Sequence, residues 1–268
     1  MKEKKPTRTW TTKMTNNEEL ALILVAAGAS ARIGFDKTGT KIKKEYLPMN
    51  GSTVLSCAAK AFLSTLNFST VVVTFPSSES REDLAENEAK AKEALFADDF
   101  VKNYKANFIF IPGGQTRQKS VLEALEAIED KAPDTSLVFI HDGARPFLKA
   151  ETVELTYRAA LEFGASVPGL QPVETQKKID ENGFIEKHLV RSSLTAVQTP
   201  QVFQFQTILE AHRIASESSK VFTDDTEIWD DYAAKHKKPN GKAYSKVKVV
   251  LGDPENKKIT YPEDIKSL

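Results

Sequence analysis

The apolar positions of this chain form short continuous runs that alternate with longer stretches of helical spacing. Runs typical of buried strands lie at 20–27, 71–75 and 108–111, and another begins at Leu137. Apolar residues at helical spacing predict intervening helices at 53–66, 79–96, around Val121 to Ile128, and at 151–163 with a stop at Gly164. Strands that alternate with helices are typical of α/β proteins with a mostly parallel sheet. We therefore predict one large α/β domain over residues 20–268.

The pattern changes between residues 165 and 200, where short strand-like runs and turns replace the alternation. An Asn-Gly turn at Asn182-Gly183 separates the runs 173–179 and 188–191, which predicts a β-hairpin. This segment has little apolar material of its own. We expect an arm at about 168–200 that projects and packs on a second subunit, with a surface excursion as the alternative.

The remainder returns to helices and one late strand. A helix is predicted at 205–216, a second at 226–234 behind a cap at Thr223 or Asp224, a strand at 247–251, and a last helix that starts at Pro262. The polar stretch 235–246 is predicted to be a loop.

Composition narrows the class of protein. The 268 residues include 37 basic and 37 acidic side chains, and this balance argues against a general nucleic-acid or membrane-surface binder. The single cysteine, Cys57, excludes an internal disulfide, and no apolar run approaches the roughly 20 residues that cross a bilayer. The polar residues 1–19 carry no apolar signal core. We expect a cytoplasmic protein with a flexible N-terminal tail.

Three turns that follow predicted strands carry residues suited to binding phosphate. The first passes through small residues to Arg32, so its backbone N–H groups can approach an anion closely. The second contains Gly113-Gly114, and the third places Asp142 and Arg145 directly after an apolar strand. Because open α/β sheets bind ligands at strand ends, we expect one ligand held by several of these loops. Asp142 is placed to hold Mg²⁺ on a triphosphate.

Each of these features also has a plainer interpretation. Small-residue turns join strands to helices in many α/β proteins, and Gly113-Gly114 fits that role. The lysine-rich loop 35–48 is either a solvated loop or a lid with one lysine reaching a phosphate. Arg145 could form a structural ion pair with Asp142, and His141 is either a base or a hydrogen-bonded buried side chain.

Together these motifs resemble one family, the 2-C-methyl-D-erythritol 4-phosphate cytidylyltransferases, over about residues 20–268. The resemblance is carried by Ala26-Ala27-Gly28 with Arg32-Ile33-Gly34, Lys44-Glu45-Tyr46-Leu47, Gly113-Gly114 with Arg117 and Ser120-Val121, His141 to Phe147, Thr175 with Lys177, Arg191, Thr199-Pro200-Gln201, Thr223-Asp224 and Lys258-Ile259-Thr260. It implies a Rossmann-like sheet of nucleotidyltransferase type with a projecting β-arm. It also implies CTP-dependent transfer of CMP onto a sugar-alcohol phosphate with release of pyrophosphate.

The resemblance further implies a role for each matching residue. The CTP pocket would be lined by Ala26, Ala27, Gly28, Gly114, Ser120 and Gly143, with Asp142 on Mg²⁺ and Arg145 supporting its loop. Arg32, Lys44 and Lys258 would surround the triphosphate and the reacting phosphorus. Thr175 and Arg191 would reach the methylerythritol phosphate from the arm of the partner in a homodimer, and Thr199 and Thr223 would complete that site.

The sequence departs from the family pattern at the lysine loop and the first turn. Ser30 stands where a second glycine is usual, Lys43-Lys44-Glu45 replaces the customary Pro-Lys-Gln, and Glu174 replaces an aspartate. Tyr46-Leu47 sets the register that assigns the catalytic lysine to Lys44, with Lys43 or Lys41 as alternatives.

Three other functions remain open at this point. A ribitol-5-phosphate cytidylyltransferase would share the nucleotide motifs and differ at the acceptor. A nucleotide-binding module without activity would bind CTP and release no pyrophosphate. An NAD-type oxidoreductase is disfavoured, because the first turn lacks the G-x-G-x-x-G spacing and no acid ends a second strand about 20 residues later.

Overall fold

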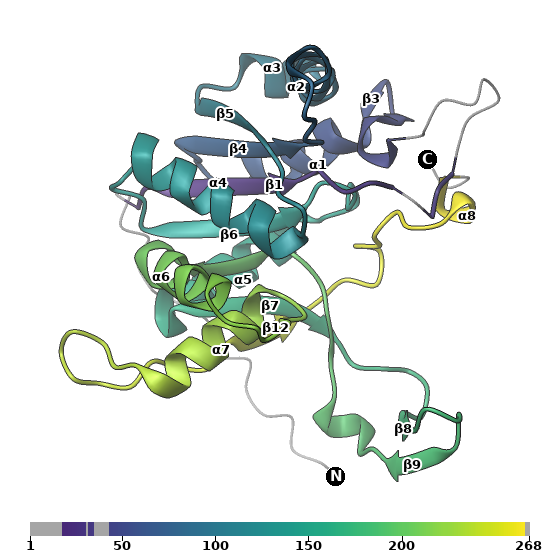
Figure 1. Cartoon of the computed structure of the whole chain (residues 1–268), viewed down its shortest axis with the longest axis vertical. Helices are drawn as coiled ribbons and strands as arrows, with labels where there is room; N and C mark the ends of the chain where they lie inside the picture. Colours follow the sequence, from purple (N-terminus) through teal and green to yellow (C-terminus); the bar gives the residue numbers. More distant parts are fainter. Residues whose placement is uncertain (1–17, 31, 35–42, 266–268) are drawn as a thin grey trace, which may run out of the picture.

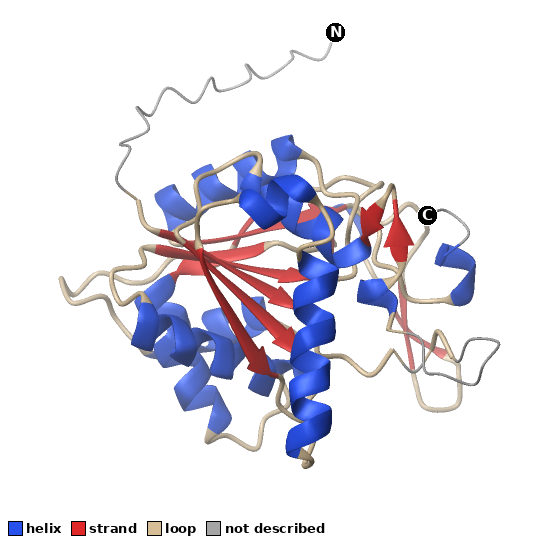
Figure 2. Ribbon diagram, turned by 90° about the horizontal axis from the view of Figure 1, so that it is seen from above, coloured by secondary structure: helices blue, strands red, loops and turns tan. Residues whose placement is uncertain are grey.

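A computed structural model of the chain describes residues 18–30, 32–34 and 43–265. Its centre is a twisted sheet of eight strands with helices on both faces (Figures 1 and 2), which confirms the predicted α/β class. The strand order is β10-β7-β11-β6-β1-β4-β5, and β12 pairs with β7. These strands span β1 Leu20–Val25, β4 Thr70–Phe75, β5 Asn107–Pro112, β6 Leu137–Asp142, β7 Ala165–Leu170, β10 Ala196–Val197, β11 Gln201–Gln204 and β12 Lys248–Leu251.

The strands that precede the three predicted turns belong to the parallel part of the sheet. β5, β4, β1 and β6 pair in parallel, so their carboxyl ends lie at one edge of the sheet. Beyond β6, the strand β11 runs antiparallel to both β6 and β7. The sheet is therefore parallel at its centre and mixed on one side.

Alternate residues of the strands build two separate cores. In β1, Leu22 and Leu24 pack into one hydrophobic cluster, whereas Ala21 and Ile23 pack into the other. The first cluster is covered by α1 Val54–Leu63, α2 Arg81–Leu95, α3 Asp99–Asn103 and α5 Ala150–Phe163, and the second by α4 Arg117–Lys131, α6 Phe205–Ser216 and α7 Asp225–Lys235. Because both faces of the sheet are covered, its strands are continuously apolar instead of alternating with polar residues.

The helix ends follow the predicted capping signals. The side chain of Asp224 accepts a hydrogen bond from the backbone N–H of Glu227, which makes it the cap of α7. Gly164 ends α5 with a φ of +91°, a left-handed conformation that glycine adopts without strain. Three short elements and a last helix complete the body: η1 Lys44–Tyr46, β2 Pro48–Met49, β3 Ser52–Thr53 and α8 Pro262–Ile265. No helix in the described part of the chain is long and apolar enough to cross a membrane.

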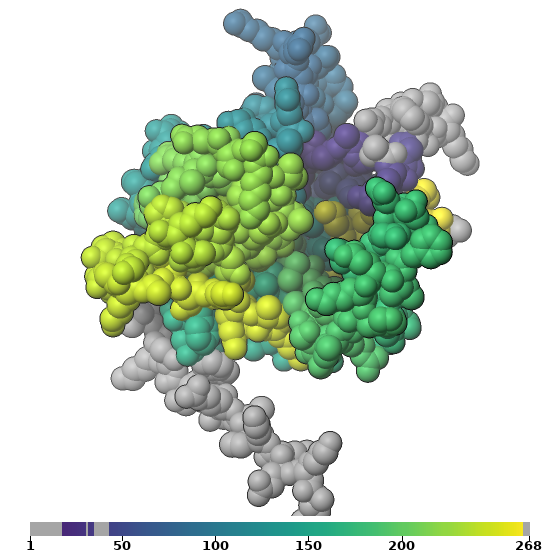
Figure 3. Space-filling view, turned by 60° about the horizontal axis from the view of Figure 1, so that its bottom comes forward, coloured from purple at the N-terminus to yellow at the C-terminus, as the bar shows by residue number. Residues whose placement is uncertain are grey.

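The arm leaves the sheet between β7 and β10. It consists of the hairpin β8 Lys177–Ile179 and β9 Ile185–His188 and the short helix η2 Arg191–Ser193. In Figure 3 this green segment stands apart from the helices of the body. The range we expected for it, 168–200, includes residues that belong to the sheet, because β7 continues to Leu170 and β10 begins at Ala196. Residues 1–17 of the expected tail lie outside the described residues.

Candidate active site

A cavity of about 810 Å³ opens at the carboxyl ends of the four parallel strands. Its wall is formed by residues that follow β1, β4, β5 and β6, together with η1 and the segment before α8. Of the residues singled out from the sequence, those that line it are Ala27, Gly28, Arg32, Lys44, Gly114, Ser120, Asp142 and Lys258. Segments far apart in the chain therefore converge on one space.

The first turn is held by the neighbouring strand. The backbone N–H groups of Ala26 and Ala27 both donate to Oγ1 of Thr74, at 3.0 and 3.2 Å. Ala26 is completely buried, so it supports the turn and does not line the cavity. Ser30 has a φ of +48°, the left-handed region that favours glycine. Ser30 therefore adopts the left-handed conformation that the usual glycine would adopt more easily at this position.

The second turn leads into the amino end of α4. Thr116 caps this helix through Lys119, and Gly114, Thr116, Arg117 and Ser120 all face the cavity. A Cβ on Gly113 would collide with that of Ala27, so glycine is required where the two turns touch. The free N–H groups and dipole of a helix amino end favour an anion here.

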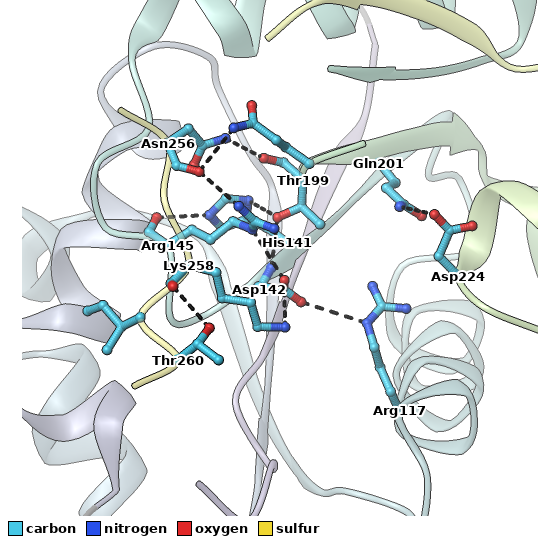
Figure 4. A network of polar contacts seen from close by, with 12 residues as sticks. Arg117, His141, Asp142, Arg145, Thr199, Gln201, Asp224, Asn256, Lys258 and Thr260 are labelled. Atoms are coloured by element: carbon cyan, nitrogen blue, oxygen red, sulfur yellow. Dashed lines mark hydrogen bonds and ion pairs between the residues drawn. The ribbon is translucent and has the colours of Figure 1, made fainter. Parts of the chain in front are cut away.

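Asp142 ends β6 and lies among three cations (Figure 4). Its Oδ2 is 3.0 Å from Nζ of Lys258 and 3.3 Å from Nε of Arg145, and its Oδ1 is 3.7 Å from Nε of Arg117. Burial by itself would raise the pKa of Asp142, but Lys258, Arg117 and Arg145 hold that pKa well below its usual value. Asp142 is therefore ionised at all physiological pH values.

Arg145 stabilises the loop that carries Lys258. Its Nη1 donates to the carbonyl of Asn256 at 2.8 Å, and the N–H of Ile259 donates to the carbonyl of Ala144 at 2.9 Å. Arg145 does not line the cavity, and neither does Gly143. A Cβ on Gly143 would lie 3.1 Å from Leu55 and 3.2 Å from the Cβ of Ala26, so this glycine serves the packing beneath the first turn.

His141 and Thr199 form a buried pair behind Asp142. Nε2 of His141 is 3.1 Å from the carbonyl of Arg145, so this nitrogen must carry the proton and donate it. Nδ1 then accepts from the hydroxyl of Thr199 at 2.9 Å, while that hydroxyl accepts from the N–H of Asp142 at 3.2 Å. Burial lowers the pKa of His141 to about 4, which keeps the ring neutral and unsuited to act as a base at pH 7. Thr199, expected at the acceptor site, is instead committed to this network.

The lysine loop places two lysines at the cavity. Nζ of Lys44 donates to the carbonyl of Ile259 at 2.8 Å, and burial lowers the pKa of this lysine. Nζ of Lys43 contacts Oε2 of Glu45 at 2.9 Å and the carbonyl of Gly28 at 2.6 Å. Lys41, the third alternative, lies outside the described residues.

Three residues expected at the acceptor phosphate lie away from this cavity. Thr175 is exposed on the arm, and Nη1 of Arg191 donates to the carbonyl of Val173 within the arm at 2.7 Å. Thr223 directs both its N–H and its hydroxyl to Glu227, at 2.9 Å each. Within one chain, these three side chains do not meet the cations of the cavity.

The cavity also includes residues to which the sequence assigned no role. Arg117 lies at the first turn of α4, where the glycine turn before the helix is the signal that could have identified it. Asn87 and Lys90 come from α2, whose charged pattern is that of an ordinary solvated helix. No local signal distinguishes them.

The fit of a divalent cation depends on Asp142. Among the residues that the structure describes, no group of three or more His, Cys, Asp and Glu side chains could hold a metal ion. Mg²⁺ is, however, commonly bound by one or two carboxylates together with substrate phosphates. An ionised carboxylate at the wall of a cationic cavity fits that second arrangement.

An α/β sheet with a glycine-lined, cation-rich cavity at its parallel strand ends is suited to binding a nucleotide, and the match to a family of nucleotidyltransferases gives the class of enzyme. The family model of 2-C-methyl-D-erythritol 4-phosphate cytidylyltransferase matches residues 20–267, so the chain belongs to that family.

Curated relatives and solved structures agree with this assignment. The chain is 35% identical to the 2-C-methyl-D-erythritol 4-phosphate cytidylyltransferase of Clostridium botulinum, over 92% of this chain and 96% of the relative. The enzyme of the same name from Clostridium beijerinckii is 32% identical, over 92% and 95%.

Among solved structures, that of 2-C-methyl-D-erythritol 4-phosphate cytidylyltransferase from Thermus thermophilus has a TM-score of 0.63 at 26% identity, over 91% of this chain and 95% of that one. The structure of 4-diphosphocytidyl-2C-methyl-D-erythritol synthase from Anaerococcus prevotii has a TM-score of 0.71 at 24% identity, over 93% and 94%, and supports the fold.

Proposed function

We propose that the protein transfers CMP from CTP to 2-C-methyl-D-erythritol 4-phosphate, forming 4-diphosphocytidyl-2-C-methyl-D-erythritol and pyrophosphate in the non-mevalonate route to isoprenoid precursors. The observation that carries the proposal is the convergence of Arg32, Lys44 and Lys258 with Asp142 on one cavity at the strand ends. The names of the family and its relatives favour methylerythritol phosphate over ribitol phosphate as acceptor. The same names favour a transferase over a role confined to nucleotide binding.

The cations answer the main difficulty of the reaction, which is that two anions must meet. An oxygen of the acceptor phosphate attacks the α-phosphorus of CTP in line, and pyrophosphate leaves. The attacking phosphate is already ionised, so no general base is needed, in agreement with a neutral, buried His141. Lys258, Lys44 and Arg32 neutralise the charge that builds up on the phosphoryl oxygens.

Binding of the nucleotide is assigned to the two turns. Gly28, Gly114 and Ser120 line the cavity and would contact CTP, with Ala26, Ala27 and Gly143 shaping the turns from behind. Asp142 would hold Mg²⁺, which when bound supplies charge neutralisation on the triphosphate.

We infer that the acceptor site is completed in a homodimer. The arm exposes large apolar side chains, with Val173 81%, Phe184 72% and Val190 67% exposed, and such a surface is suited to contact with another subunit. Thr175 and Arg191 on the arm would then hold the acceptor phosphate in the partner's site, and Thr223 would approach it from the body. We place the enzyme in the cytoplasm.

A pyrophosphate-release assay tests the reaction. With CTP and Mg²⁺ present, we expect release with methylerythritol phosphate and little release with ribitol phosphate. Release with ribitol phosphate alone would contradict the assignment of methylerythritol phosphate as the acceptor. Binding of CTP without release of pyrophosphate with either acceptor would contradict the assignment of a transferase activity.

Mixed subunits test the shared site. Lys258→Ala and Arg191→Ala proteins, each nearly inactive alone, are unfolded together, refolded and assayed. If the arm serves the partner, half of the random dimers carry one intact site, and about a quarter of the wild-type activity returns by that statistical mixing. No recovery, with dimers demonstrated by sedimentation, would mean that both residues serve the same chain's site.

A further inference from the structure

A series of contacts between ionisable side chains leads from the cavity into the core of the protein. Nη2 of Arg117 is 2.8 Å from Oδ2 of Asp225, and Oδ1 of Asp225 is 3.2 Å from Nε2 of His212. Asp225 and His212 are both completely buried, on α7 and α6, and neither lines the cavity. Arg117 does line it, with about a third of its side chain exposed. One end of this series is therefore at the site and the other is in the core.

Two carboxylates contact the guanidinium of Arg117. Nη2 forms an ion pair with Asp225, while Nε is 3.7 Å from Oδ1 of Asp142 (Figure 4 shows the Asp142 contact). A guanidinium is planar and carries five donors in a fixed fork, so ion pairs from two different nitrogens restrict the direction of the other N–H groups. Arg117 lies at the amino end of α4, which favours an anion, and lines the cavity, so N–H groups that do not meet a carboxylate are available to a phosphate there.

The electrostatics indicate that Asp225 acts as an anion toward Arg117. Burial would raise the pKa of Asp225, but Arg117 and His212 outweigh it and lower the pKa below its usual value. The backbone of Asp225 is fixed in turn, because its N–H donates to Oε1 of Gln201 at 3.1 Å. Replacing buried charged groups by apolar side chains is often neutral or stabilising, so stability alone gives little reason for this arrangement.

We propose that Asp225 and His212 are positioning residues for the transfer reaction: they orient Arg117 so that its guanidinium binds a phosphate of the substrates in the cavity. This inference rests on the proposed function and extends it to a fourth cation, Arg117, and to two residues that touch no substrate. His212 acts through Asp225, and Asp225 acts through Arg117.

A double-mutant cycle separates positioning from a purely structural role. Asp225→Asn and Arg117→Gln are made singly and together, and kcat/KM for CTP is measured for all four proteins. We expect Asp225→Asn to lower kcat/KM about tenfold or more when Arg117 is present, and less than about threefold in the Arg117→Gln background. Equal losses in both backgrounds, or no loss in either, would overturn the proposal.

Two further variants keep the cycle decisive. Asp231→Asn removes an acid of the same helix that forms ion pairs with Lys220 and Lys235, and we expect wild-type kcat/KM. If Asp225→Asn does not fold at the assay temperature, His212→Asn replaces it, which leaves the contact between Asp225 and Arg117 in place. The loss of kcat/KM in His212→Asn should be smaller and should again disappear in the Arg117→Gln background. A loss that persists there would overturn the proposal.

The failure of this inference can be distinguished from the failure of the proposed function. Absence of CMP transfer in the wild-type protein would contradict the proposed function, whereas an additive cycle in an active enzyme contradicts only this inference.

Discussion

The cavity at the strand ends buries charged side chains, whereas the arm exposes apolar ones. At the cavity, ionised side chains are nearly buried: Lys44, Glu45 and Asp142 are 8%, 3% and 7% exposed. On the arm, apolar side chains such as Val173 and Phe184 are mostly exposed, at 81% and 72%. Buried charges and exposed apolar groups are both unfavourable unless something compensates for them.

The compensation comes from different sources in the two regions. Each buried charge of the cavity has partners within the same chain, as Asp142 has in Lys258 and Arg145. The arm mainly contacts itself, for example through Lys178 and Glu186, and its apolar residues remain uncovered. A single chain therefore supplies the partners of the buried charges at its cavity, whereas the arm is suited to a surface that the chain itself does not supply.

The largest effect is expected from removing a cation at the cavity. Lys258→Ala should lower kcat/KM by roughly 10²–10³, as for the loss of one preorganised group that stabilises transition-state charge. The fold should survive, because Lys258 is partly exposed and Asp142 keeps Arg145 and Arg117. Steady-state kinetics and thermal unfolding measure the two effects, and Lys257→Ala, an exposed neighbour, is the matched control. Activity close to wild type in Lys258→Ala would remove this lysine from the reaction.

A second, smaller effect is expected on the pH dependence of stability, for which each region offers one histidine. His141 is completely buried behind the cavity and its pKa is lowered from 6.5 to about 4, whereas His188 is exposed on the arm. Between these two pKa values of His141 the unfolded chain binds a proton that the folded chain does not. The free energy of unfolding should therefore fall as the pH decreases below about 6.5, by up to about 1.4 kcal/mol per pH unit from this group.

Urea unfolding between pH 4.5 and 7.5 measures that slope. His141→Gln should flatten it, and His188→Gln should leave it as in the wild type. If both variants kept the wild-type slope, His141 would not be the neutral, buried group that the hydrogen bonds to Thr199 and Arg145 require.

The sequence predicted the sheet and the convergence of the turns at its strand ends, because both depend on local signals. Continuous apolar runs mark strands that are buried on both faces, as in β1, and the glycine turns after them mark the strand ends. In an open parallel sheet these ends share one edge, so Gly28, Gly114 and Asp142 could be brought together without any knowledge of tertiary contacts.

The parts that the sequence did not predict depend on contacts between distant segments. Thr199 was expected at the acceptor, yet its hydroxyl is occupied by His141, 58 positions earlier. Nothing near His212 in the sequence indicates that it meets Asp225, or that Asp225 meets Arg117. The positions of Thr175 and Arg191 relative to the acceptor also depend on a second subunit, which one chain cannot specify.

The smallest effect is expected from Glu45, the acid that faces the cavity. Burial lowers the pKa of Lys44, and the charge of Glu45 opposes this by raising it. Glu45→Gln removes this opposing charge, so the pKa of Lys44 should fall further and the alkaline limb of the pH–rate profile should move toward lower pH. At pH 7 the rate should stay within about threefold of wild type, because Glu45 is only one of several charges that act on Lys44. Glu88→Gln, which breaks a similar pair with Lys92 on an exposed helix, should leave the profile unchanged. An alkaline limb that did not move would mean that the charge of Lys44 does not limit the rate, and the role assigned to Lys44 would be wrong.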